Sequence, residues 1–120
     1  TGALIRAAVE LPARVERKGR TAPDEQRKAL AAYGDAIGVA FQVVDDLLDV
    51  EGSTEELGKP AGSDAAKGKA TWPSLNGIAA ARTRADELLA EARAALEALP
   101  PGPARDDLAS LGALIVRRRF

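Results

Sequence analysis

Residues 30–50 carry an unusual distribution of polar and apolar side chains for a helix. Wound at about 100° per residue, their polar and glycine positions fall in a stripe roughly 120° wide. The stripe contains Gly34, Asp35, Gly38, Gln42, Asp45, Asp46 and Asp49. The remaining surface carries Leu30, Tyr33, Ile37, Phe41, Val43, Val44, Leu47 and Leu48. A surface helix has the opposite proportions, so the pattern predicts a helix buried nearly all round, with its polar stripe lining a cleft.

The rest of the chain is also typical of helices, without strand-like alternation or internal repeats. Helices are expected over residues 2–18, from Thr21 to about Val50, over 78–99 and over 104–118, with a short turn at Trp72–Asn76. Pro12 should kink the first helix, and Gly52 and Ser53 should end the second. A glycine- and lysine-rich loop is expected over 51–70, with one helical turn at Thr54–Leu57. The predicted fold class is therefore all-α, with about four to five helices.

Composition restricts the chemistry that such a fold can carry. The chain has 120 residues, of which 29% are charged and 46% hydrophobic, as is typical of one soluble globular domain. Its net charge of −1 argues against general binding to nucleic acid or membranes. The absence of cysteine and histidine excludes disulfides, thiolate or imidazole metal ligands, and mechanisms that need a histidine base. A bound metal would need oxygen ligands, which favours a hard ion such as Mg²⁺.

Two further absences bear on location and extent. No apolar run is long enough to span a bilayer and no signal peptide is present, so a cytoplasmic protein is expected. The chain contains no methionine and opens on Thr1. It is therefore expected to be a piece of a longer polypeptide.

Asp45, Asp46 and Asp49 form a D-D-x-x-D pattern near the end of the second expected helix. The carboxylates of Asp45 and Asp49, one turn apart, repel each other by a few tenths of a kcal/mol. The helix dipole disfavours them by about 0.3–1 kcal/mol more, and no lysine or arginine stands three or four positions away. A divalent cation bound by the carboxylates would relieve both terms. Alternatively, the aspartates solvate one face of the helix or pair with basic residues distant in sequence.

Gly34 and Gly38 lie on the same stripe as the aspartates. Because glycine has no side chain, it lets another group approach the helix backbone closely. That group could be a ligand or a second, tightly packed helix, and both interpretations are open.

The loop after the aspartates supplies positive charge. Lys59, Lys67 and Lys69 place three ammonium groups just beyond the carboxylates. Acidic residues for a metal and basic residues for phosphate, on neighbouring segments, are what a magnesium–diphosphate site requires. The stretch from Gly52 to Lys59 does not fit a P-loop, because Pro60 replaces the Ser or Thr and no strand precedes it. The alternative for these lysines is an exposed hydrophilic hinge.

Three blocks of this sequence have counterparts in a known family. FQVVDDLLDV is similar to a second aspartate-rich motif, and GSTEELGKPAGSDAAKGKATWPSL to the loop behind that motif. TGALIRAAV is similar to the segment after a Lys-Thr-[GA] element. In this order and spacing, the blocks resemble the C-terminal half of the trans-prenyl diphosphate synthase (polyprenyl synthetase) family, of the farnesyl diphosphate synthase type. The similarity extends over the whole chain.

The resemblance implies the isoprenoid synthase fold, in which two aspartate-rich helices face each other across a cavity. About three Mg²⁺ ions bridge the helices to the diphosphate of an allylic substrate. Ionisation gives an allylic carbocation, isopentenyl diphosphate attacks it head to tail, and a proton is lost. Geranyl diphosphate is the expected allylic substrate and farnesyl diphosphate the expected product, made by a full-length homodimer. A geranylgeranyl or longer-chain synthase is the alternative.

The resemblance also implies roles for residues on or near the stripe. Asp45 would be a direct metal ligand, and Asp46 and Asp49 would complete or orient the same shell. Thr1 and Gln42 match positions whose oxygens lie near the reacting allylic carbon. There they would stabilise developing positive charge.

Further residues are matched to the substrates. Lys59 and Lys69 would bind the allylic diphosphate, Lys59 as part of the catalytic set. Phe41 would lie near the isopentenyl diphosphate site or serve packing. Asp64 would orient a loop lysine, whereas Trp72 is expected in the core.

The chain departs from the family pattern in its extent. The lysine expected before Thr1 is missing, and so is the N-terminal half with the first aspartate-rich motif. The polypeptide alone is therefore expected to be inactive, and a catalytically silent subunit of a heteromeric synthase is the non-enzymatic alternative. The run Arg117–Arg119 resembles basic ends in the family, or opposes the dipole of the last helix without any ligand.

Overall fold

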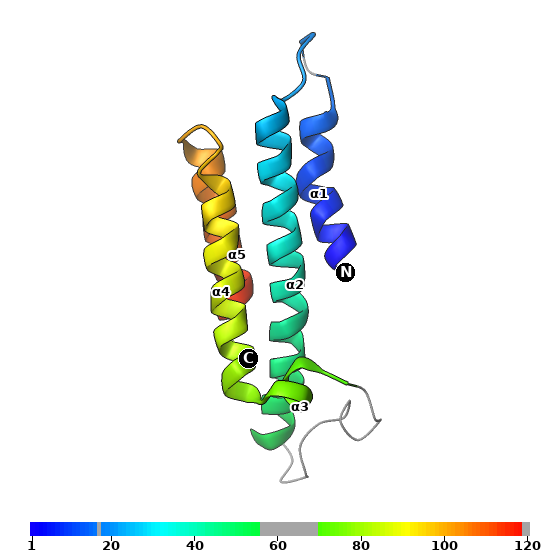
Figure 1. Cartoon of the computed structure of the whole chain (residues 1–120), viewed down its shortest axis with the longest axis vertical. Helices are drawn as coiled ribbons and strands as arrows, with labels where there is room; N and C mark the ends of the chain where they lie inside the picture. The colour runs from blue at the N-terminus through cyan, green and yellow to red at the C-terminus, as the bar shows by residue number, and fades with distance from the viewer. Residues whose placement is uncertain (17, 56–69, 119–120) are drawn as a thin grey trace.

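The computed structural model describes residues 1–16, 18–55 and 70–118. These residues form five helices: α1 (Gly2–Arg14), α2 (Asp24–Glu55), α3 (Trp72–Asn76), α4 (Ile78–Leu96) and α5 (Pro103–Arg117). No β-strand occurs in the described ranges, which confirms the all-α prediction. The four longer helices run along the long axis of an elongated molecule of 58 × 23 × 22 Å, and the short α3 lies across it (Figure 1). In the same parts of the chain, no helix is both long and apolar enough to cross a bilayer.

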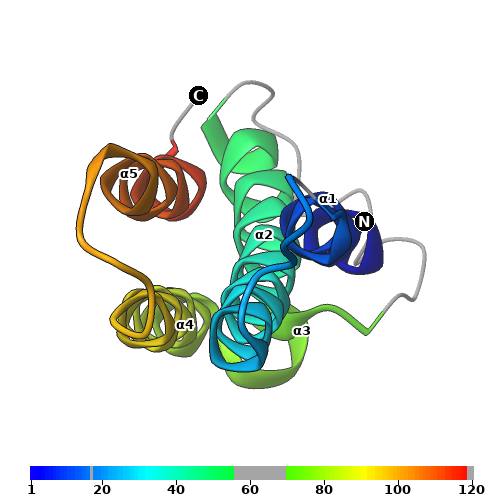
Figure 2. The ribbon, with the colours of Figure 1, turned by 90° about the horizontal axis from the view of Figure 1, so that it is seen from above.

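Helix α2 is the central element of the molecule. Helix α1 runs antiparallel to it on one side, while α4 and α5 form an antiparallel pair on the other (Figures 1 and 2). The short α3 lies against the C-terminal part of α2 and the start of α4. Each of the other helices therefore contacts α2. The environment of each α2 residue depends on which of these helices lies against it.

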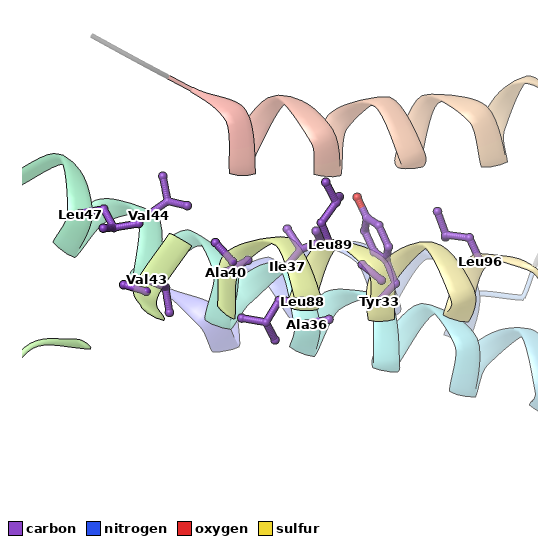
Figure 3. Close-up of a cluster of buried hydrophobic side chains, with 13 residues drawn as sticks. Tyr33, Ala36, Ile37, Ala40, Val43, Val44, Leu47, Leu88, Leu89 and Leu96 are labelled. Atoms are coloured by element: carbon purple, nitrogen blue, oxygen red, sulfur yellow. The ribbon is translucent and has the colours of Figure 1, made fainter. Parts of the chain in front are cut away.

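The hydrophobic core lies mainly between α2 and α4 (Figure 3). From α2 it takes Tyr33, Ala36, Ile37, Ala40, Val43, Val44 and Leu47, and from α4 Ala81, Ala85, Leu88, Leu89, Ala92 and Leu96. Both sets recur at helical spacing, so each helix buries one continuous stripe. The alanines leave room for the larger residues opposite them, as close packing requires.

Two glycines of the stripe explain the packing of α1 on α2. A Cβ atom placed on Gly34 would lie 2.8 Å from Cα of Arg6, and one placed on Gly38 would lie 2.9 Å from Cα of Gly2. Both distances are shorter than any real side chain tolerates. Of the two interpretations left open by the sequence, the structure shows helix packing at both positions.

Several helix ends differ from the expected ones. Helix α2 continues to Glu55, so Gly52 and Ser53 do not end it and the first residues of the expected loop are helical. One interior glycine costs a helix only about 1 kcal/mol relative to alanine, too little to break a helix held by tertiary contacts. At this end Arg82 of α4 forms an ion pair with Glu51.

Helix α1 ends at Arg14 instead of residue 18, with Val15 already extended. Pro12 lies in its last turn. Helix α4 ends at Leu96 rather than at residue 99. Local sequence signals locate helix ends to within a few residues only, and these differences are of that size.

Candidate metal and diphosphate site

The polar stripe of α2 is covered by α1 at Gly34 and Gly38 and becomes more exposed toward its C-terminal part. Gln42 and Asp45 are exposed, and the Asp45 side chain keeps 64% of its accessible surface. Asp49 is half-buried and lies one helical turn beyond Asp45. Burial of α2 is therefore found on its core side and at the two glycines under α1, and a cleft lined by the rest of the stripe stays a prediction.

The start of α1 comes to the same stripe. Gly2 packs against Gly38, and Gln42 follows Gly38 one turn later on α2. Thr1 directly precedes Gly2 and is exposed. Its carbonyl accepts a hydrogen bond from the Ile5 amide at 3.0 Å, but its side chain makes no capping bond. The Thr1 hydroxyl is thus not used to cap its own helix.

Asp46 has a different role from its neighbours. Its Oδ2 accepts a hydrogen bond from the backbone amide of Trp72 at 3.3 Å. Trp72 is the first residue of α3, whose N-cap Thr71 forms a reciprocal capping box with Ser74. The Trp72 side chain packs partly buried against the core, as predicted. Asp46 therefore ties α3 to α2, and its expected part in the metal shell stays a prediction.

Asp45 has a partner that is distant in sequence. Nη2 of Arg118 donates to Oδ1 of Asp45 at 3.2 Å and to the carbonyl of Phe41 at 3.3 Å. The guanidinium of Arg118 also lies over the ring of half-buried Phe41, 4.2 Å from its centroid. The pairing with a remote basic residue, left open by the sequence, is thus found at Asp45. The sequence offered one weak signal for it, an aromatic residue one turn before the aspartate in a chain with a basic end.

Asp35, at the N-terminal part of the stripe, belongs to the contact between α1 and α2. Nη1 of Arg6 lies 3.1 and 3.0 Å from its two carboxylate oxygens. Arg6 and Arg14 also pair with Glu10 on α1. These contacts raise the pKa of Arg6 and lower that of Glu10, because each charge is stabilised by its hydrogen-bonded partner. This network links α1 to α2 at the surface, with Asp35 paired to Arg6.

Asp45 and Asp49 are the stripe aspartates that remain as candidate ligands for Mg²⁺. In the parts of the chain that the structure describes, no three or more carboxylates converge to form a metal site. Mg²⁺ seldom uses such a cage and is more often bound by one or two carboxylates together with water and substrate phosphates. Asp45, exposed and contacted by Arg118 through one oxygen, can supply such a ligand. Asp49 stands one turn further along the same helix face.

The predicted diphosphate-binding residues cannot be compared with this geometry. Lys59, Lys69 and the loop residue Asp64 lie outside the described residues, as does Arg119. Among the described residues, the Gly2–Gly38 contact places the start of α1 one turn from Gln42 on the same face of α2.

A family model and curated relatives both match this chain. The family model described as Polyprenyl synthetase matches residues 1–99. Farnesyl diphosphate synthase of Escherichia coli (strain K12) is 48% identical over 102 residues, covering 82% of this chain and 32% of that protein. The chloroplastic geranylgeranyl pyrophosphate synthase 9 of Arabidopsis thaliana is 44% identical over 104 residues, covering 87% of this chain and 28% of that protein.

A solved structure shows the same arrangement of helices. A decaprenyl diphosphate synthase from Rhodobacter capsulatus superposes with a TM-score of 0.80 and 33% sequence identity, covering 97% of this chain and 46% of that one. This likeness confirms the predicted fold. The chain spans about a third of the length of the curated relatives that it matches.

Proposed function

Because the chain belongs to the polyprenyl synthetase family, we propose that its residues form the second metal-binding half of a trans-prenyltransferase site. The reaction is the head-to-tail condensation of isopentenyl diphosphate with an allylic diphosphate. The observation that supports the proposal most is the contact of Gly2, the neighbour of Thr1, with Gly38 on the face of α2 that also holds Gln42 and Asp45.

In this proposal each stripe residue has a distinct task. Asp45 and Asp49 bind Mg²⁺, and Asp46 holds α3 in place through the Trp72 amide. When bound, Mg²⁺ would neutralise charge that develops on the leaving diphosphate. The Thr1 hydroxyl and the Gln42 amide oxygen face developing positive charge on the allylic carbon and stabilise it.

The substrates are held by residues outside the stripe. Lys59 and Lys69 bind the allylic diphosphate as point charges, since an ammonium group suits phosphate oxygens. Phe41 borders the isopentenyl diphosphate position from α2. The rest of the domain would supply the first aspartate-rich helix and complete the site, in a cytoplasmic homodimer.

Farnesyl diphosphate, made from geranyl diphosphate, is the proposed product. The identity of 48% with the farnesyl diphosphate synthase of Escherichia coli supports this choice. A longer product is the second candidate, because the chain is also 44% identical to a geranylgeranyl pyrophosphate synthase and shares its fold with a decaprenyl diphosphate synthase. Product analysis of the full-length enzyme with labelled isopentenyl diphosphate separates the two.

The metal role is tested in the full-length polypeptide that carries these residues. Asp45→Ala should lower turnover roughly a hundredfold or more, because it removes a ligand that acts on the transition-state charge. Helix content measured by circular dichroism should stay unchanged. The matched control is Asp86→Ala, an exposed aspartate of α4, which should keep full turnover. Turnover of Asp45→Ala within a few-fold of the control would refute the proposed site.

A further inference from the structure

We propose that Arg118 is an internal counter-ion of Asp45, which neutralises the carboxylate in the absence of metal and opposes the binding of Mg²⁺ there. The inference rests on the proposed function in one respect, namely that Asp45 is a metal ligand. It adds Arg118, a residue 73 positions further along the chain, to the groups that set the metal affinity of Asp45.

Three contacts hold the Arg118 side chain against α2. Its Nη2 serves two acceptors on α2, Oδ1 of Asp45 at 3.2 Å and the Phe41 carbonyl at 3.3 Å. Its guanidinium lies 4.2 Å from the centroid of the Phe41 ring, within the range of cation–π attraction. The Arg118 side chain keeps 27% of its accessible surface, against 64% for Asp45. Arg118 is therefore laid along α2, over the turn that leads to Asp45.

The same contacts show why Arg118 can leave. One nitrogen is shared between two acceptors, and Nε of Arg118 is buried without a hydrogen-bond partner among the described residues. A guanidinium with a buried, unused donor is incompletely satisfied. Ion pairs with an exposed partner are also weak. Arg118 follows the last residue of α5, so its departure does not require any helix to unwind.

The expected direction of the effect follows from the charges. Arg118 opposes a divalent cation at Asp45 because it occupies Oδ1 and because like charges repel. Removal of the guanidinium should therefore tighten metal binding. By reciprocity, metal binding should weaken the hold of Arg118 on α2. A residue that only terminates α5 would have neither effect.

The chain offers a built-in probe of metal binding. Trp72 is its single tryptophan, and the backbone amide of Trp72 is hydrogen-bonded to Asp46, next to Asp45. Tb³⁺ is a hard cation that prefers oxygen ligands, as Mg²⁺ does. Its luminescence, excited through Trp72, reports occupancy at this end of α2. Titration with Mg²⁺ then gives the Mg²⁺ affinity by displacement.

Arg118→Gln is compared with Arg117→Gln, which removes the same charge from the adjacent, exposed residue. Arg118→Gln should tighten Mg²⁺ binding about three- to tenfold, the effect of one unit charge near a divalent ion in a screened, exposed site. Arg117→Gln should change the affinity by less than about twofold. Arg118→Met, whose side chain still covers Phe41, should act like Arg118→Gln and guards against a folding defect.

If both Arg118 variants bind Mg²⁺ as tightly as Arg117→Gln or more weakly, the proposed counter-ion role of Arg118 is wrong. Asp45→Asn separates this failure from failure of the proposed function. If Asp45→Asn abolishes the Tb³⁺ signal while the Arg118 variants bind like wild type, only the counter-ion role is wrong. If Asp45→Asn binds Tb³⁺ and Mg²⁺ like wild type, Asp45 is not a metal ligand. The proposed counter-ion role of Arg118 is then wrong as well.

Discussion

Tyr33 is the most constrained polar side chain in the core. It is 1% exposed, and its hydroxyl donates a hydrogen bond to the carbonyl of Leu108 on α5 at 2.7 Å. Figure 3 shows the Tyr33 hydroxyl pointing toward α5. This bond joins α2 to α5 across the apolar interior. Burial raises the pKa of Tyr33 above its ordinary value of 10.0, because the ionised phenolate would lose its hydration.

Tyr33→Phe should lower the free energy of unfolding by about 1 kcal/mol at neutral pH, since the Leu108 carbonyl loses its partner. The difference from wild type should shrink as pH rises above 10.0, the ordinary pKa of tyrosine. Above that pH the unfolded state releases the tyrosine proton before the folded state does, which stabilises unfolding in the wild type alone.

Urea unfolding of both proteins from pH 7 to 11 measures this difference. Lysines that titrate in the same range are common to both chains, so they cancel. A stability difference that stays constant up to pH 11 would contradict the raised pKa.

At the scale of elements, α1 and α2 depend on backbone-to-backbone packing at two glycines. Helix α1 contributes no fully buried residue, although Ile5 and Val9 pack partly buried against the core. Close approach is made possible by Gly34 and Gly38 and is reinforced at the surface by Arg6 with Asp35. Polar pairing at an exposed surface contributes little by itself, so the glycines matter most.

Gly38→Ala should destabilise the α1–α2 contact by about 1–3 kcal/mol, because its Cβ would meet the backbone of Gly2. Gly52→Ala is the matched control in the same helix, where a Cβ would meet nothing within 4 Å. The control should gain up to about 1 kcal/mol from helix propensity. Thermal unfolding followed by circular dichroism gives both values. Equal stability of the two variants would show that α1 packs less closely than the structure indicates.

Over the whole molecule, stability is distributed unevenly. The core joins α2 to α4 and α5, whereas α1 contacts only α2 among the described elements. Helix α1 exposes Leu4 and Leu11, which lie seven residues apart and therefore on one face, and Val15 is exposed just beyond its end. An element with few buried apolar groups opens at lower cost than the core does.

Native-state hydrogen exchange should resolve this difference. The amides of α1 should exchange through a partial opening, well before those of Tyr33–Leu47 in α2 and of α4, because α1 can leave while the core stays packed. In Gly38→Ala the exchange of α1 should accelerate further, while that of α4 should not change. Equal protection of α1 and α4 would indicate that all the helices open as one unit.

The stripe of α2 was predictable because the periodicity of a helix reports which residues share one face. The roles within it were only partly predictable. Asp46 is turned to the Trp72 amide, Gly38 is covered by Gly2, and Asp45 is paired with a residue 73 positions away. None of these partners lies within the three- or four-residue spacing at which helical neighbours interact.

The all-α class, the approximate helices and the acidic face of α2 were all contained in the sequence by itself. They rest on local interactions, in which each residue acts on neighbours within a turn or two. Only the tertiary structure decided where α2 ends, which glycines meet another backbone and which aspartate receives an arginine. Those outcomes depend on how separate helices pack, and the spacing along any one helix carries no information about the side chains of another.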